Sequence, residues 1–193
     1  MPYTNAHLSD FNEVHRRVAS TYPVEKAASM FYYYKGSPYV DIIHRAKYRQ
    51  RPVILRKMAR KYAVMLQDAS FFDGIDVIVP VPLHLWKLIR RGYNQSEKIA
   101  RGLSDVTGIP VAKGLVAYRG HGSQTSKGSF SRWVNTMDVY GVRNPERFSG
   151  KHVLVVDDVI TTGATILACV RAIEESVKGV KVSVLSLGLA HLA

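Results

Sequence analysis

Cysteine is almost missing from this chain of 193 residues, because Cys169 is the only one. A single cysteine excludes an internal disulfide framework and a cysteine-based zinc site within the chain, so we expect no structural zinc. No apolar run approaches the roughly 18 residues of a membrane span, which argues against membrane insertion. The first residues also lack the charged start and apolar core of a signal peptide. We therefore expect a cytoplasmic protein.

Acidic residues are also scarce, since 15 Asp and Glu stand against 27 Lys and Arg and the formal net charge is +12. Acids are absent from residues 42–67 and 106–137. The first of these stretches holds two tyrosines, Tyr48 and Tyr62, that we expect to stack on unpaired bases. Single-stranded DNA is therefore one candidate partner. A helix face that is only solvated would have the same composition. The stretch has eight basic residues: Arg45, Lys47, Arg49, Arg51, Arg56, Lys57, Arg60 and Lys61.

The strongest chemical pattern lies in residues 153–165, Val-Leu-Val-Val-Asp-Asp-Val-Ile-Thr-Thr-Gly-Ala-Thr. Its apolar start predicts a strand buried on both faces, and the apolar spacing beyond it predicts a helix. Between them stand two carboxylates, Asp157 and Asp158, and a run of hydroxyls around Gly163. Backbone N–H groups at a helix N-terminus, together with threonine hydroxyls, form a phosphate cradle. Carboxylates accept hydrogen bonds from sugar hydroxyls or hold Mg²⁺ through water, so the pattern indicates a ribose 5-phosphate site.

A second anion-binding loop is expected after a predicted strand at residues 75–81. Prolines, two adjacent arginines, a glycine and the start of another helix follow this strand. Arginine charge and the close backbone approach that glycine permits suit a pyrophosphate, although a basic surface loop has the same composition. The residues expected in this loop are Pro82, Leu83, Arg90, Arg91, Gly92, Asn94 and Gln95.

Two other interpretations of residues 153–165 are a strand–turn–helix whose acids only cap the helix, and a Walker B strand. The second requires a G-x-x-x-x-G-K-[ST] loop, which the chain does not contain.

Residues 153–165 closely resemble the motif that binds 5-phosphoribosyl 1-pyrophosphate (PRPP) in the type I phosphoribosyltransferases. The resemblance implies that Asp157 and Asp158 contact the ribose hydroxyls, hold Mg²⁺ through water and are the catalytic candidates. The implied PRPP-binding residues are Asp157, Asp158, Thr161, Thr162, Gly163, Ala164 and Thr165.

Residues 79–84 and 91–95 of the second loop look like those of one family in particular, the ComF family. ComF proteins are phosphoribosyltransferase-like and are tied to DNA uptake in competent bacteria. ComF proteins usually begin with a cysteine-rich, zinc-binding segment, which has no counterpart in residues 1–30. His121 stands where the family usually has threonine. The resemblance also implies a flexible loop, although an ordinary hairpin would have the same composition. Its residues here are Arg119, Gln124, Lys127, Arg132 and Asn135.

The sequence thus predicts an α/β protein of the type I phosphoribosyltransferase fold, with a central, mostly parallel sheet flanked by helices. A helical segment is expected at residues 1–30, a phosphoribosyltransferase-like domain at residues 31–193, and a small basic hood at residues 31–67. One function is Mg²⁺-dependent transfer of the 5-phosphoribosyl group from PRPP to a nitrogen acceptor. The alternative is a non-catalytic protein of competence that senses PRPP or handles single-stranded DNA. DNA-uptake machinery and a second copy of the chain are further candidate partners.

Overall fold

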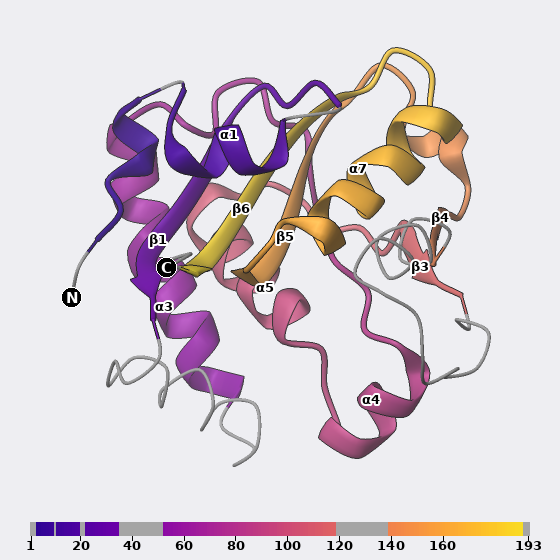
Figure 1. The fold of residues 1–193 in the computed structure, drawn as a ribbon, viewed down its shortest axis with the longest axis horizontal. Helices are drawn as coiled ribbons and strands as arrows, with labels where there is room; N and C mark the ends of the chain where they lie inside the picture. The colour runs from indigo at the N-terminus through magenta and orange to yellow at the C-terminus, as the bar shows by residue number, and fades with distance from the viewer. Residues whose placement is uncertain (1–2, 10, 20–21, 35–51, 119–138, 191–193) are drawn as a thin grey trace.

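The computed structural model describes residues 3–9, 11–19, 22–34, 52–118 and 139–190 (Figure 1). These residues form a four-stranded parallel sheet in the order β1-β6-β5-β2 and a separate antiparallel pair, β3-β4. The strands are β1 (Ala27–Tyr33), β2 (Val77–Pro80), β3 (Leu115–Ala117), β4 (Tyr140–Val142), β5 (His152–Ile160) and β6 (Lys181–Ala190). The helices are η1 (Ala6–Leu8), α1 (Glu13–Val18), α3 (Pro52–Asp68), α4 (Leu85–Arg91), α5 (Gln95–Thr107), η2 (Pro145–Phe148) and α7 (Ala164–Ser176). The predicted α/β fold with a parallel sheet is confirmed.

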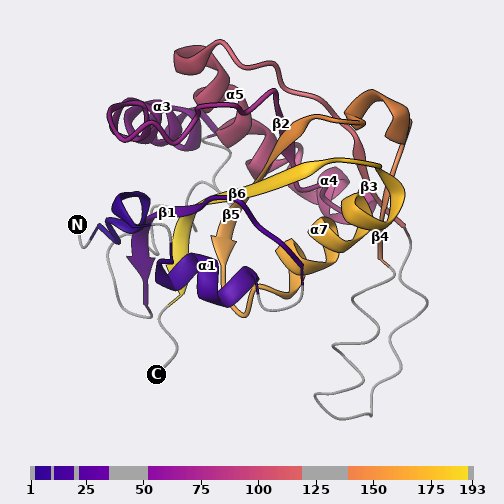
Figure 2. The same ribbon diagram turned by 90° about the horizontal axis from the view of Figure 1, so that it is seen from above.

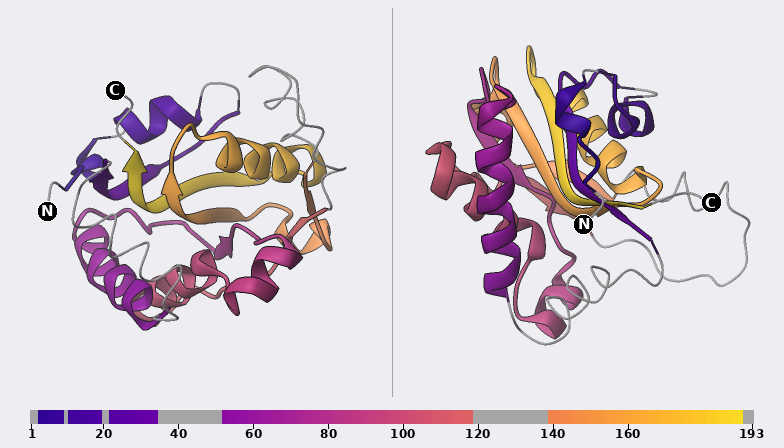
Figure 3. Two further views of the ribbon diagram at one scale, coloured as in Figure 1. Left: turned by 60° about the horizontal axis from the view of Figure 1, so that its bottom comes forward. Right: turned by 90° about the vertical axis from the view of Figure 1, so that its left-hand side faces the viewer.

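Helices cover both faces of the parallel sheet and produce three layers (Figures 2 and 3). Helices α3 and α5 lie on one face, and α1 and α7 lie on the other. Residues 153–156 of β5 alternate between the two hydrophobic clusters, and each is at most 1% exposed. This is the burial expected for a continuous apolar run in a parallel sheet. None of the described helices is long and apolar enough to cross a membrane.

Helix α3 carries its basic residues outward and its apolar residues inward. Arg56, Lys57, Arg60 and Lys61 are exposed, while Leu55 and Tyr62 are buried. Tyr62 is 1% exposed and its ring meets the ring of His7 edge-on, with the centroids 6.0 Å apart. The expectation that Tyr62 stacks on bases is therefore wrong, because the helical period places it seven residues after Leu55 on the buried face.

The N-terminal part differs from its prediction. Strand β1 begins at Ala27 and pairs in parallel with β6, so the expected boundary at residue 30 falls inside a strand of the central sheet. Residues 27–30, Ala-Ala-Ser-Met, have little intrinsic β-propensity, and burial in the core places them in the strand. Asn12 begins the helix α1, because its side chain accepts a hydrogen bond from the backbone N–H of His15 at 2.9 Å.

The described parts of the expected hood belong to the main body of the protein. Residues 31–33 lie in β1, and residues 52–67 lie in α3, whose apolar side packs against the sheet and α5. Residues 35–51 lie outside the described residues. The predicted flexible-loop positions also lie outside them: Arg119, Gln124, Lys127, Arg132 and Asn135.

Candidate active site

The described candidate residues lie near the carboxyl ends of β5 and β2 and in the segments that follow these strands. Strand β5 leads through residues 161–163 into α7, and β2 leads through residues 81–84 into α4. The two strands are paired neighbours in the sheet. Ligands of open parallel sheets bind in the crevice outside the carboxyl ends of the strands. The fold therefore brings the two predicted anion-binding loops to one edge.

Asp157 and Asp158 are half-buried near the end of β5. The sequence predicted them to follow the strand, but pairing with β6 continues to Ile160, because the apolar residues after the acids extend the strand. The Oδ1 atom of Asp157 accepts hydrogen bonds from Ser96 Oγ at 3.0 Å and from the backbone N–H of Asp158 at 2.8 Å. Ser96 lies in the first turn of α5, so this contact joins the end of β5 to the start of α5.

Two tyrosines, Tyr93 and Tyr140, interact electrostatically with the acids. Burial raises the pKa of Tyr140, and nearby Cys169 and Asp157 raise it further. Burial also raises the pKa of Tyr93, an effect that Arg91 opposes and Asp158 reinforces. Both phenols therefore stay protonated at neutral pH and can donate hydrogen bonds.

The arginines of the second loop lie on a helix that the sequence did not indicate. Residues 85–91 form α4, whose last turn carries Arg90 and Arg91. Gly92 ends this helix with φ +75°, a left-handed conformation that glycine adopts readily. Helix α4 has no buried residue, and its seven residues are fewer than the window over which an apolar period distinguishes a helix from a loop. Its exposed apolar side chains are Leu85, Trp86 and Ile89.

The remaining residues of the second loop lie between β2 and α5. The Asn94 side chain donates to the carbonyl of Val81 at 2.9 Å and accepts from the backbone N–H of Ser96 at 3.0 Å. Asn94 thereby caps α5, whose first residue, Gln95, is buried. Three of the predicted residues line a pocket of about 160 Å³: Pro82, Leu83 and Asn94.

The loop between β5 and α7 has the form expected of a phosphate cradle. Gly163 precedes the first residue of α7 and has φ +86°, a conformation that favours glycine. The side chains of Thr161 and Thr162 are exposed, and Ala164 and Thr165 open the helix. The first backbone N–H groups of a helix have no partner within it and attract anions. This loop can therefore offer hydroxyls and N–H groups to one phosphate.

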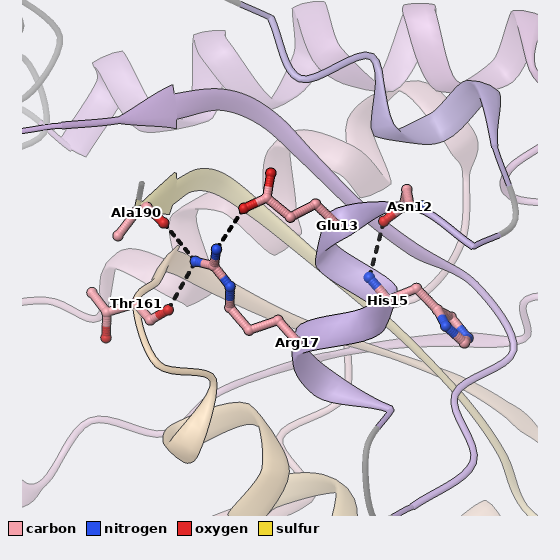
Figure 4. A network of polar contacts seen from close by, with 6 residues as sticks. All are labelled: Asn12, Glu13, His15, Arg17, Thr161 and Ala190. Atoms are coloured by element: carbon pink, nitrogen blue, oxygen red, sulfur yellow. Dashed lines mark hydrogen bonds and ion pairs between the residues drawn. The ribbon is translucent and has the colours of Figure 1, made fainter. Parts of the chain in front are cut away.

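Helix α1 contacts this loop through Arg17 (Figure 4). The Arg17 Nη1 atom donates to the carbonyl of Thr161 at 3.0 Å and to the carbonyl of Ala190 at 2.5 Å. Its Nη2 atom donates to Glu13 Oε1 at 2.6 Å. A Cβ atom placed on Gly163 would lie 3.0 Å from the Arg17 carbonyl oxygen. No signal in the sequence indicated this contact, because 144 positions separate Arg17 from Thr161.

Replacing Gly163 with alanine should lower the free energy of unfolding by about 1–2 kcal/mol for the left-handed backbone alone. The added Cβ would also press on the Arg17 carbonyl, so the full loss should be larger. Gly108→Ala is the matched control, because Gly108 has φ +74° and an added Cβ would meet no atom within 4 Å. Urea denaturation of both variants measures the difference, and equal losses would show that the contact with α1 contributes nothing.

The two carboxylates fit a magnesium ion that takes most of its ligands from elsewhere. Mg²⁺ usually keeps several waters and binds one or two carboxylates together with substrate phosphates. Among the described residues, no group of three or more His, Cys, Asp or Glu side chains gathers in a way that could hold a metal. A pair of carboxylates such as Asp157 and Asp158 suits an ion whose other ligands are waters and substrate phosphates.

Known proteins with similar sequences connect this site to a family. The family model described as the phosphoribosyl transferase domain matches residues 45–192. Competence protein F of Haemophilus influenzae is 31% identical over 135 residues, which cover 67% of this chain and 58% of that protein. DNA utilization protein YhgH of Escherichia coli K12 is 29% identical over 133 residues, with the same two coverages. The chain thus spans less than two thirds of the length of these curated relatives.

The solved structure of adenine phosphoribosyltransferase from Leishmania tarentolae aligns with 75% of this chain and 74% of its own chain. The identity is 13% and the TM-score is 0.46. The assignment rests on the family model, which matches well over half of the chain. This protein therefore belongs to the phosphoribosyl transferase domain family, in which it is similar to the ComF-like competence proteins.

Proposed function

We propose that this protein binds PRPP with Mg²⁺ at the carboxyl edge of the sheet and transfers the 5-phosphoribosyl group to a nitrogen acceptor, releasing pyrophosphate. The observation that carries the proposal is that three features lie near or after the carboxyl ends of two neighbouring strands, β5 and β2. They are the paired acids of β5, the loop that opens α7, and the arginines at the end of α4. Each feature is common alone, but together they match the ribose, the 5-phosphate and the pyrophosphate of PRPP.

The binding roles follow from the chemistry of each group. Asp157 and Asp158 accept hydrogen bonds from the ribose hydroxyls, since carboxylates are acceptors only. The threonine hydroxyls and first N–H groups of α7 bind the 5-phosphate. Arg90 and Arg91 supply positive charge for the pyrophosphate. Magnesium, when bound, would neutralise part of the pyrophosphate charge, with Asp157 and Asp158 holding it through water.

The chain's own residues would act mainly by positioning and by charge. As the bond between ribose C1 and pyrophosphate breaks, negative charge grows on the pyrophosphate and positive charge grows on the ribose. The arginines of α4 stabilise the first, and the carboxylates of β5 stabilise the second. Ser96 and the backbone N–H of Asp158 hold Asp157 in place, so little reorganisation is needed.

A pyrophosphate-release assay tests the proposal, with nucleobases, amines and single-stranded DNA as acceptors and with PRPP affinity measured by calorimetry. Turnover with any acceptor supports the transferase. PRPP affinity without turnover supports a PRPP-sensing protein instead. A chain that binds no PRPP in the presence of Mg²⁺ would contradict both functions.

Binding of single-stranded DNA is the second candidate function, and the outer face of α3 favours it. Lys57, Arg60 and Lys61 are exposed there. Arg56 is less available, because its guanidinium donates to both carboxylate oxygens of Asp105 at 2.7 and 2.6 Å. The names of the relatives refer to competence and DNA utilization, which agrees with a DNA-related role.

Replacing Ser96 with alanine should weaken PRPP binding by about fivefold, which corresponds to roughly 1 kcal/mol for one hydrogen bond. The variant removes the hydroxyl that donates to Asp157 without touching the ligand-binding groups themselves. Ser104→Ala is the control, because Ser104 is a partly exposed serine of the same helix. Calorimetry with PRPP and Mg²⁺ gives both affinities. Equal affinities of the two variants would show that Ser96 does not prepare Asp157 for the ribose.

A further inference from the structure

We propose that Arg17 is a positioning residue that holds the loop between β5 and α7 in the shape required for the 5-phosphate; this rests on the function proposed above. Three separate parts of the protein meet at its guanidinium (Figure 4). They are the loop at Thr161, the end of β6 at Ala190, and the side chain of Glu13 in α1. The phosphate cradle is therefore tied to helix α1 and to the sheet by one side chain.

The surroundings of Arg17 strengthen these bonds. Its side chain is 10% exposed, while the bond to Thr161 lies at the protein surface. Hydrogen bonds from a charged donor are stronger than neutral ones, and a low local dielectric increases the difference. The carbonyl of Thr161 lies two residues before Gly163, where the backbone takes its left-handed turn into α7. A donor fixed on this carbonyl restrains the peptide that begins the cradle.

A second contact reaches the same loop from the backbone of Arg17. A Cβ atom added to Gly163 would lie 3.0 Å from the Arg17 carbonyl oxygen, so α1 and the turn at Gly163 are in close contact. Side chain and backbone of one residue thus touch both ends of the segment from Thr161 to Gly163.

Helix α1 is itself fixed in the core, which Arg17 requires in order to restrain the loop. Val14 and Val18 are fully buried in the same hydrophobic cluster as Ile166 and Val170 of α7. Burial of such side chains stabilises the contact of α1 with the core. Because α1 is fixed, movement of the loop at Thr161 would break the hydrogen bond between Arg17 and the Thr161 carbonyl.

Three of the five N–H donors of the Arg17 guanidinium are directed at the protein. Its Nη1 atom donates to two carbonyls and its Nη2 atom donates to a carboxylate, so these donors point at the protein. Arg17 therefore acts through the loop. A loop that is ordered before binding loses less conformational entropy when the phosphate arrives, which raises the affinity for the 5-phosphate group.

The first test compares Arg17→Met with Arg16→Met, measuring the affinities for ribose 5-phosphate and PRPP by calorimetry. Methionine keeps the apolar stem but removes the donors, so Arg17→Met should weaken both ligands by the same factor of about ten, the value expected for the loss of strong hydrogen bonds. Arg16 is exposed on the same helix, and its substitution changes the charge equally, so it should leave both affinities unchanged. Arg17→Lys keeps the charge but not the fork of donors, and should give an intermediate loss. If Arg17→Met does not fold, the affinities of Arg17→Lys for the two ligands test the proposal instead.

A pair of double-mutant cycles separates positioning from general loosening of the fold. Losses from Arg17→Met and from Thr162→Val, a cradle variant, should be coupled. Losses from Arg17→Met and Arg90→Met should add within a factor of about two, since Arg90 lies on a different element. Unchanged ribose 5-phosphate affinity in Arg17→Met, or additivity in both cycles, would overturn the role of Arg17. A wild-type chain that binds neither ligand would instead overturn the proposed function, and the role of Arg17 with it.

Discussion

Replacing Asp157 and Asp158 together with asparagine should weaken PRPP binding at least tenfold, because hydrogen bonds to charged groups contribute roughly 1.5–3 kcal/mol each. Asparagine has nearly the same shape as aspartate. Its amide oxygen at position 157 can still accept the hydrogen bonds from Ser96 Oγ and the backbone of residue 158. The fold should therefore survive, and calorimetry should report the loss of ligand affinity alone.

A double substitution of two other acids is the charge-matched control. Asp68 and Asp73 are exposed at the end of α3 and just after it, so Asp68→Asn with Asp73→Asn changes the net charge equally. Chelation of Mg²⁺ should lower the wild-type affinity for PRPP, and the double variant at 157 and 158 should lose most of this dependence. Wild-type affinity in that variant would remove the acids of β5 from the ribose site.

Reversing the charges of Lys57, Arg60 and Lys61 to glutamate should abolish binding of single-stranded DNA and leave PRPP affinity within about twofold, as expected for sites that do not interact. All three side chains lie on the exposed face of α3. Wild-type binding should fall steeply with salt, with a slope of roughly −0.7 for each phosphate neutralised on a single strand. Fluorescence anisotropy at several salt concentrations measures both the affinity and the slope.

Arg56 should be left unchanged in this variant. Its hydrogen bonds to Asp105 lower the pKa of that carboxyl and connect α3 with α5. A glutamate at position 56 would face Asp105 and disturb the packing of the two helices. Effects on DNA binding could then not be assigned to the surface charge alone.

Three lysines at the opposite edge of the sheet provide the control for charge reversal. Lys151, Lys178 and Lys181 are exposed near the amino ends of β5 and β6, and their replacement by glutamate changes the net charge by the same amount. This variant should keep most of the DNA affinity. No binding by the wild-type chain at low salt, or equal losses in both variants, would mean that the basic face of α3 is only solvated.

The strand, turn and helix of the proposed phosphate site could be predicted from the sequence because they are consecutive. Residues 153–165 contain the buried strand, the acids, the hydroxyls and the glycine that begins α7. A left-handed turn, a helix N-terminus and a strand buried on both faces each leave a local pattern of residue types. The parallel order of the sheet followed in the same way from the alternation of strands and helices.

Contacts between distant segments were decided only by the tertiary structure. Nothing local marks Arg17 as a neighbour of Thr161, or Ser96 as a neighbour of Asp157, since these pairs are 144 and 61 positions apart. Burial similarly extended β1 to Ala27, although Ala-Ala-Ser-Met has little β-propensity. Sequence patterns record the interactions of a segment with itself and with solvent. Which segments become neighbours depends on packing of the whole core, and this brings Arg17 of α1 to the loop at Thr161.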